Sequence, residues 1–233
     1  MATLLQLRTQ ARQRADMVKS KFVTDEELTS YVNASMYELY DLLVSTYEDW
    51  YIADPITFTL TGTADAYSLP TDFYKLRGID RSVDGTENGT WFTVTPFMFI
   101  DRNKYNQINN IGGTIPTVKY RLMGDNLKFV PYNVAAGLYR MWYIPSAPLL
   151  VDDTDTFNGV DGWEEYIVVD CAIKMLAKQE DDVSVFMAQK NALKQRIEEL
   201  AAERDAGSSA TISDGRAAAQ QGYFSVFGNG TLL

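Results

Sequence analysis

The chain has 233 residues, a formal net charge of −10 and no histidine. Its apolar fraction of 46% and charged fraction of 22% are those of a soluble globular protein with one large domain or two small ones. The acidic balance argues against a protein that grips nucleic acid through its phosphates, and the lack of histidine removes the commonest general base and metal ligand.

No segment predicts a membrane span or a signal peptide. No apolar run reaches the roughly 20 residues that a membrane helix needs. Arg8, Arg12 and Arg14 follow the first leucines, which is not the order of a signal peptide. Cys171 is the single cysteine, and its apolar neighbours predict a small buried side chain. We therefore expect a protein without membrane contact that is made and kept in the cytoplasm.

The first predicted element is a helix from Thr3 to about Ser20. Thr3 and Gln6 have the spacing of a capping box, and apolar or small residues recur at helical spacing as far as Val18. Residues 1–21 carry five basic side chains and one acidic one. The chain is thus expected to begin with a basic helix.

The second predicted element is a long amphipathic helix from Thr24 to Tyr51. It starts with a capping box formed by Thr24 and Glu27, and one face is apolar along its whole length. The opposite face is acidic, and the range contains no basic residue. Two such helices of opposite charge can pair with each other or with copies of the chain in a ring. The candidate subunit contacts are Arg8, Arg12, Arg14, Glu38, Asp41 and Glu48.

Between residues 55 and 148 the pattern changes from helical spacing to alternation, which predicts strands. Strands are expected near 56–61, 66–69, 75–82, 90–95, 117–122, 127–131 and 137–144. A hairpin is predicted around Gly124–Asp125–Asn126, and residues 84–90 form a second turn cluster. Residues 95–106 are expected to form a short helix or an irregular loop. The whole predicts one antiparallel β module inserted between helices.

Two more helices are predicted after the β module. The first starts at a capping box of Asp161 and Glu164 and is apolar almost all round, so it should lie at the centre of the bundle against Leu39 and Leu43. The last runs from about Asp182 to Arg204. The predicted fold class is therefore α+β. A helical bundle of about four helices (1–54 and 149–206) carries an antiparallel β domain (55–148) and an extended C-terminal tail (207–233).

The tail is rich in small and polar residues but carries aromatic ones. Such a composition cannot close a core by itself. It fits either a docking peptide or a disordered terminus whose aromatic residues are incidental. The candidate docking residues are Tyr223, Phe224, Val226 and Phe227.

The sequence contains no recognisable catalytic or metal-binding motif. The loop carboxylates Asp152, Asp153 and Asp155 suggest calcium, but the spacing places Phe157 where a third ligand is needed. The carboxylate pairs Glu164–Glu165 and Asp181–Asp182 stand at predicted helix starts, where the helix dipole favours negative charge. The alternative is that such a pair forms the two catalytic carboxylates of a glycosidase. We expect no enzyme activity, no metal and no cofactor.

Aromatic side chains offer one binding alternative. Tyr47, Trp50 and Tyr51, together with Trp91, Trp142 and Tyr143, have the composition of a sugar-binding platform. The same residue types are also expected in a core and at a helix–sheet junction. The rival functions from the residues alone are therefore a carbohydrate-binding module and a hydrolase.

Three blocks resemble the head-to-tail connector, or adaptor, proteins of tailed bacteriophages. They read RADMVKSKFVTDEELTSYVNASMYELYDLLVSTYEDWY, YSLPTDFYKLRGID and GWEEYIVVDCAIKMLAKQEDD. The resemblance implies a structural virion protein at the head–tail interface, assembled in the host cytoplasm. It implies a dodecameric ring below the portal protein that extends the channel for double-stranded DNA, without sequence-specific binding.

The same resemblance implies the partners and their contact surfaces. The bundle would build the ring, the C-terminal tail would reach the portal, and the lower face would meet tail proteins of the nozzle, tube or fibre. Many simpler adaptors are nearly all helix, so the large β insertion departs from the family pattern. Another phage tail structural protein, such as a tail terminator or a nozzle-like protein, is the alternative within the same class.

Overall fold

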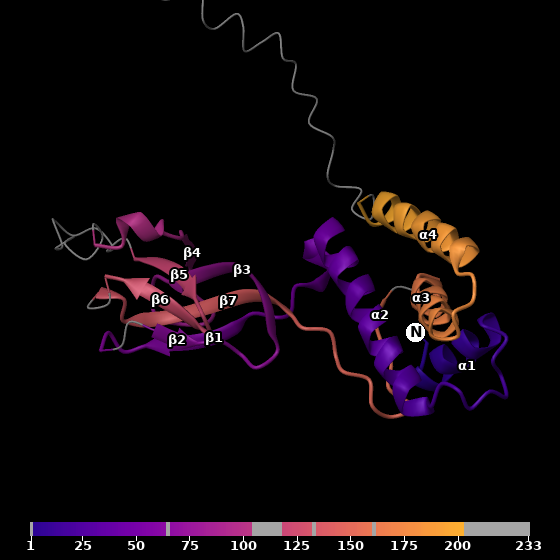
Figure 1. The fold of residues 1–233 in the computed structure, drawn as a ribbon. Helices are drawn as coiled ribbons and strands as arrows, with labels where there is room; N and C mark the ends of the chain where they lie inside the picture. The colour runs from indigo at the N-terminus through magenta and orange to yellow at the C-terminus, as the bar shows by residue number, and fades with distance from the viewer. Residues whose placement is uncertain (1, 64–65, 104–117, 132–133, 160–161, 203–233) are drawn as a thin grey trace, which may run out of the picture.

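The structure is a computed structural model that describes residues 2–63, 66–103, 118–131, 134–159 and 162–202. Within these ranges the chain forms a bundle of four α-helices and a β module that stands beside it (Figure 1). Two chain crossings connect the two parts, one from α2 into the module and one from β7 back to α3. The mixed α+β fold class is confirmed. No helix in the described part of the chain is long and apolar enough to cross a membrane.

Helix α1 (Leu4–Arg14) starts as predicted but ends earlier. The Thr3 hydroxyl accepts a hydrogen bond from the Gln6 amide at 3.2 Å, and the Gln6 side chain accepts one from the Thr3 amide at 3.0 Å. The prediction that this helix reaches Ser20 is wrong. Asp16 adopts a left-handed conformation with φ of 54°, which turns the chain. Val18, expected on the apolar face, is therefore 58% exposed.

Helix α2 (Asp25–Thr46) begins at the predicted cap, where the Thr24 hydroxyl accepts the Glu27 amide at 3.2 Å. The prediction of one helix to Tyr51 is wrong, because Tyr47 leaves the helical region at φ −145° and ψ 83°. A short 3₁₀ turn, η1 (Glu48–Tyr51), follows. This break directs the end of the predicted helix toward the β module.

The β module contains seven strands within the described residues, all close to their predicted positions: β1 (Ile56–Leu60), β2 (Ala66–Ser68), β3 (Phe73–Ser82), β4 (Trp91–Val94), β5 (Lys119–Met123), β6 (Asn126–Val130) and β7 (Gly137–Pro145). They form two antiparallel sheets, ordered β1-β7-β3-β4 and β2-β6-β5. The predicted hairpin is confirmed, with Met123 opposite Asn126 and Gly124 at φ 57° in the turn. A 3₁₀ turn, η2 (Phe99–Asp101), follows β4.

Each part of the fold has its own apolar core. The module's core joins residues from both sheets, such as Phe58, Ile79, Phe129 and Tyr139. The bundle's core is centred on α3 (Glu165–Lys178), which packs against α1, α2 and α4 (Ser184–Ala202). The predicted central position of this helix is thus confirmed. Two separate cores explain why the β insertion leaves the bundle intact.

The start of α3 differs from the prediction of an Asp161–Glu164 capping box. The helix begins at Glu165, and Glu164 makes no side-chain cap. The Glu164 carboxylate instead accepts the Gly162 amide at 2.7 Å. Asp161 lies outside the described residues, as does the whole predicted docking tail with Tyr223, Phe224, Val226 and Phe227.

Candidate functional site

The three arginines predicted as subunit contacts bind within their own chain. Arg8 forms an ion pair with Asp153 and donates to the Thr29 hydroxyl at 3.2 Å. Arg12 donates to the Val23 carbonyl at 2.8 Å and pairs with Asp25 at 2.9 Å. These contacts fasten α1 to the start of α2 and to the connection before α3.

Arg14 and the acidic candidates are also engaged within the chain. Arg14 pairs with Glu165 of α3. Glu38 pairs with Lys190 of α4 at 2.6 Å and accepts the Tyr166 hydroxyl at 3.2 Å. No described contact joins any of the three predicted arginines to Glu38, Asp41 or Glu48. Between the two helices of opposite charge, the ion pair that the structure describes is Arg12–Asp25 at their near ends, beside the hydrogen bond from Arg8 to Thr29.

Asp41 and Glu48 belong to a polar junction between the bundle and the β module. Asp41 accepts the Tyr74 hydroxyl at 2.6 Å, and Glu48 forms ion pairs with Lys75 and Arg77 of β3. Arg77 also pairs with Asp49 at 2.6 Å. The break after α2 is what brings Glu48 and Asp49 to β3.

Aromatic rings fill the same junction. Tyr40 makes edge contacts with Tyr51, Tyr74 and Phe157, with ring centroids 5.1, 5.8 and 6.3 Å away. Its hydroxyl donates to the Pro145 carbonyl at 2.6 Å. Burial, with smaller contributions from nearby Tyr51, Tyr74 and Asp41, raises the pKa of Tyr40 to about 12. Tyr40 therefore ties α2 to the end of β7.

A buried polar cluster inside the bundle escaped the sequence analysis. Asp170 is 4% exposed and binds Lys174 at 2.6 Å, Lys190 at 2.7 Å and the Ser35 hydroxyl at 2.5 Å. Burial raises the pKa of this carboxyl, but the hydrogen bonds from Lys174, Lys190 and Ser35 outweigh it, so the net pKa lies below its usual value. The sequence does contain a signal for this cluster, because Asp170 and Lys174 stand four residues apart inside an apolar run.

The chemistry of this cluster is structural. The Lys174 ammonium donates to the Ser35 hydroxyl at 2.8 Å, so it has no lone pair free to take the serine proton, as the base of a Ser–Lys pair would. Ser35 is also 0% exposed, so no substrate reaches its hydroxyl. Burial raises the pKa of the neighbouring Cys171 to about 12, which keeps the thiol protonated. The cluster instead joins α2, α3 and α4.

The other chemical alternatives are explained by local structure. Asp155 accepts the amides of Val151 and Asp152 at 2.7 and 2.8 Å, which lowers its pKa. Asp182 accepts the Ser184 amide at 2.9 Å at the start of α4. Within the described ranges no group of three or more histidine, cysteine or carboxylate residues is placed to hold a metal ion.

The predicted aromatic platform is mostly used inside the fold. Tyr143 is buried, and the Trp142 indole donates to Asp80 at 2.8 Å. The Arg140 guanidinium lies 4.5 Å from the centre of the Trp91 ring and 5.2 Å from that of Trp142. This arrangement matches the expected core and helix–sheet junction, and the guanidinium covers one face of each indole ring.

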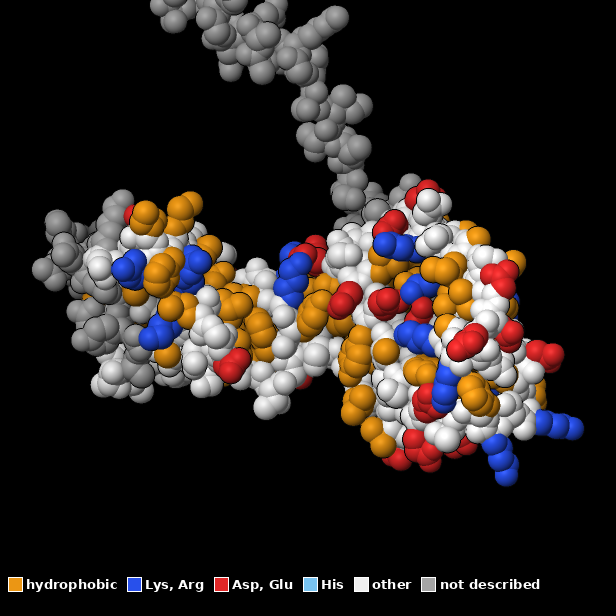
Figure 2. Space-filling model, viewed as in Figure 1, with side chains coloured by type: hydrophobic (Ala, Val, Ile, Leu, Met, Phe, Trp, Pro, Cys, Tyr) orange, Lys and Arg blue, Asp and Glu red, His pale blue; other side chains and the backbone are white. Residues whose placement is uncertain are grey.

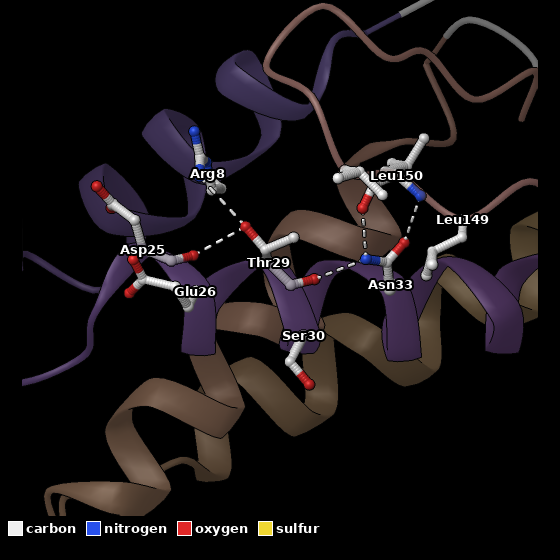
Figure 3. Close-up of a pocket in the computed structure, with 9 residues that line it drawn as sticks. Arg8, Asp25, Glu26, Thr29, Ser30, Asn33, Leu149 and Leu150 are labelled. Carbon is white, nitrogen blue, oxygen red and sulfur yellow. Dashed lines mark hydrogen bonds between the residues drawn. The ribbon is translucent and has the colours of Figure 1, made fainter.

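One open groove lies beside the first turns of α2. Its floor is set by Asn33, whose side chain binds the backbone of Leu150 (Figure 3). Asp25 and Glu26 lie at one end and Leu149 at the other, with Arg8 above Thr29 (Figure 3). Its volume is about 510 Å³. The groove combines an acidic end with an exposed apolar end.

A second exposed patch lies at the far end of the β module. It is formed by η2 and its neighbours, where hydrophobic side chains gather beside basic ones (Figure 2). Met98 and Ile100 are 71% and 83% exposed. This end of the molecule is distant from the helical bundle (Figure 1).

Charge is divided between the two parts of the chain. Residues 55–148 hold nine basic and seven acidic side chains. Residues 1–54 and 149–206 together hold 11 basic and 23 acidic ones. The negative charge of the protein therefore resides in the segments that form the helices.

Comparison with known proteins identifies the family of the chain. No curated protein matches it. The SU10 adaptor protein family matches residues 2–217, which include the bundle, the β module and the beginning of the C-terminal tail. The chain therefore belongs to the SU10 adaptor protein family and is a structural adaptor protein of a bacteriophage.

Proposed function

We propose that the chain is a head-to-tail adaptor that binds below the portal as a dodecameric ring, extends the DNA channel and provides the attachment surface for the tail. The observation that carries this proposal is the family match over residues 2–217. The protein is then a component of the virion at the head–tail interface, assembled in the host cytoplasm.

The two parts of the fold have different tasks in this proposal. The bundle (1–54 and 149–206) builds the ring, and the β domain (55–148) contacts tail proteins of the nozzle, tube or fibre. The separate apolar cores support this division, because each part can present its surface without rearranging the other. The junction at Tyr40 and Glu48 keeps the two surfaces in a set orientation.

The charge distribution suits a conduit for DNA. A ring that lets a duplex slide must not hold its phosphates, and negative charge on the wall repels them. The helical segments carry that charge, with 23 acidic against 11 basic side chains. Double-stranded DNA thus passes through the channel without sequence-specific binding.

The C-terminal tail (207–233) is the portal-docking segment in this proposal. Tyr223, Phe224, Val226 and Phe227 are its anchors, since aromatic and branched side chains supply most of the apolar area of a docking peptide. The six residues predicted as subunit contacts can still contact another copy in the ring through the atoms that their partners within the chain leave exposed. The Glu38 side chain, for example, is 53% exposed beside its bond to Lys190.

Electron microscopy of the purified chain mixed with its portal protein tests the proposal. A ring of the chain on one face of the portal, with an open axial channel, is the expected result. A chain that leaves the portal unchanged at high concentration contradicts it. Glycan binding without portal binding would instead favour the carbohydrate-binding alternative.

A truncated chain that ends after Gly207 tests the role of the tail. Helical content and thermal unfolding should match the full chain, because both described cores lie before this residue. Portal binding should fall by at least tenfold as the aromatic anchors are lost. Unchanged affinity would assign portal binding to the bundle and remove the docking role from the tail.

A further inference from the structure

Contacts between copies of this chain need surfaces that its own contacts leave exposed. All six predicted subunit-contact residues bind partners within the chain, as described above. Two of the apolar patches exposed in the described part of the chain lie at well-separated places in the fold. One is the tip of the β module, formed by Met98, Phe99 and Ile100, and the other is the rim of the groove, formed by Leu149 and Val151.

The tip combines apolar side chains with positive charge. Met98, Phe99 and Ile100 are 71%, 47% and 83% exposed, although they are consecutive large hydrophobic residues. The Arg102 guanidinium lies 4.6 Å from the centre of the Phe99 ring, and that of Arg121 lies 5.9 Å away. The tip thus presents an apolar knob flanked by two cations, with Asp101 as the acidic residue at the end of η2 (Figure 2).

The groove has the opposite character. Leu149 and Val151 are 62% and 66% exposed along its apolar rim. Asp25 and Glu26 stand at its other end, in the first turn of α2 (Figure 3). The backbone amide of Glu26 and the Thr24 side chain lower the pKa of the Glu26 carboxyl, so it is negatively charged near neutral pH. The groove thus offers an apolar surface beside the carboxylates of Glu26 and of Asp25, which pairs with Arg12, and Arg8 also lines it.

We infer that the tip of one copy docks into the groove of a second copy, with Met98–Ile100 against Leu149 and Val151, and Arg102 facing Glu26. This inference rests on the proposed ring and refines it. The bundles form the body of the ring, the tip of each β domain contacts the bundle of the next subunit, and the rest of that domain stays free for tail proteins. Apolar contact at the centre and opposite charges at the edge are the usual composition of a protein interface.

The two surfaces lie on different parts of the chain, so the contact is head-to-tail. Each bound pair still has one unoccupied tip and one unoccupied groove. Such a heterologous contact adds further copies until the rotation closes a ring. A self-complementary contact would stop at a dimer instead.

Charge reversal across the contact is the test. The variants are Arg102→Glu, Glu26→Lys and the double variant, compared with the wild type by sedimentation and by electron microscopy, alone and with portal. Each single variant should weaken self-association about tenfold, and the double variant should restore it, because the charges are exchanged across the contact. Arg196→Glu and Glu199→Lys on the exposed face of α4 are matched controls that should have no effect.

The outcomes separate this inference from the proposed function. Weakening by the single variants, rescue by the double variant and intact controls support the tip–groove contact. If the wild type forms rings and the single variants form them equally well, the contact is wrong while the adaptor proposal stands. If the wild type forms no ring with portal present, both proposals fail. Equal loss of self-association in the α4 controls also contradicts the tip–groove contact, because the loss would then not depend on where the charge is reversed.

Crosslinking gives an independent readout of the same contact. Cysteines placed at Ile100 and Leu149 in one chain should be joined by a short bis-maleimide into a ladder of dimers, trimers and longer oligomers. Either cysteine alone should give dimers at most, and the native Cys171 is buried and does not react. A double-cysteine variant that gives no product beyond dimers contradicts the head-to-tail geometry.

Discussion

The side chain of Asn33 pairs with the backbone of Leu150 as a neighbouring strand would. Its Nδ2 donates to the Leu150 carbonyl at 2.9 Å, and its Oδ1 accepts the Leu150 amide at 2.9 Å. Leu150 is 2% exposed and Asn33 is 8% exposed, so water does not satisfy these backbone groups. The pair fastens the connection between β7 and α3 to α2 and forms the floor of the groove.

Asn33→Ala should lower the free energy of unfolding by about 2 kcal/mol, because it leaves a buried N–H and a buried C=O without partners. Chemical denaturation followed by circular dichroism measures the change. Asn191→Ala on the exposed face of α4 makes the same substitution in a helix without buried partners. It should change the free energy by less than about 0.5 kcal/mol. Equal effects of both variants would show that helix propensity, not the Leu150 pair, is responsible.

Asp170→Asn should lower the free energy of unfolding by more than Asn33→Ala does. It removes the charge that Lys174 and Lys190 share at 2.6 and 2.7 Å inside the bundle. Breaking a buried ion pair by neutralising one partner costs about 3–5 kcal/mol. The lower end of this range is expected, because the Lys174 and Lys190 side chains are 31% and 22% exposed and Lys190 keeps its bond to Glu38. Chemical denaturation is the measurement, and Glu198→Gln at the exposed Lys194 pair is the control, with a cost below about 0.5 kcal/mol. A loss under 1 kcal/mol for Asp170→Asn would mean that water reaches the cluster.

The bundle should lose stability in acid. The pKa of Asp170 is lowered from 3.8 in the folded chain, so the unfolded chain binds its proton first as the pH falls. The carboxylate therefore contributes stability above the unfolded pKa, and this contribution disappears as the pH falls through the lower folded value. Thermal unfolding at a series of pH values below 4 should show a steep loss in the wild type. The unfolding temperature should fall less steeply with pH in Asp170→Asn. Equal steepness in both proteins would exclude Asp170 as the cause of the acid sensitivity.

The chain should also lose stability in alkali. Burial raises the pKa of Tyr40 and Tyr139 to about 12, and the hydrogen bond to Asp41 raises that of Tyr74 to about 12. The folded chain keeps these protons at a pH where the unfolded chain, near 10, has lost them. Stability is thus complete below pH 10 and declines as the pH rises toward 12. Tyrosinate absorbance should titrate in two phases, and the late phase should shrink in Tyr40→Phe.

The ion pairs at the junction should control the orientation of the β module. Glu48→Lys replaces two attractions, to Lys75 and Arg77, by repulsions. These groups are partly exposed, so the free energy of unfolding should change by no more than about 1 kcal/mol. Small-angle X-ray scattering should nevertheless show a larger radius of gyration, since the module is less firmly held. Glu87→Lys within the module is the control, and identical scattering of both variants would assign the orientation to the aromatic contacts of Tyr40 alone.

Local patterns were sufficient to predict most elements of this chain. Alternation located the seven described strands to within two residues at either end, and the Thr3 and Thr24 caps located two helix starts. The apolar run around Cys171 predicted the central helix. These features depend on neighbours in sequence, such as a hydroxyl three residues before an amide, and therefore leave a local signal.

Tertiary contacts decided the features that the sequence left open. Helical spacing continues through Tyr47, yet the chain breaks there, and Glu48 and Asp49 pair with Lys75 and Arg77 more than 25 residues away. The order of strands in the two sheets was equally beyond local signals, because alternation shows which face of a strand is buried but not which strand lies beside it.

The sequence by itself determined the positions of the strands, the starts of the first two helices and the family resemblance, which rest on residue type and spacing. Only the tertiary structure decided how the charges are used. Arg8, Arg14, Glu38 and Glu48 had the character of contacts between copies, and each has a partner in its own chain that is distant in sequence. A charged side chain carries no local record of its partner, because an ion pair depends on where the fold brings two side chains together.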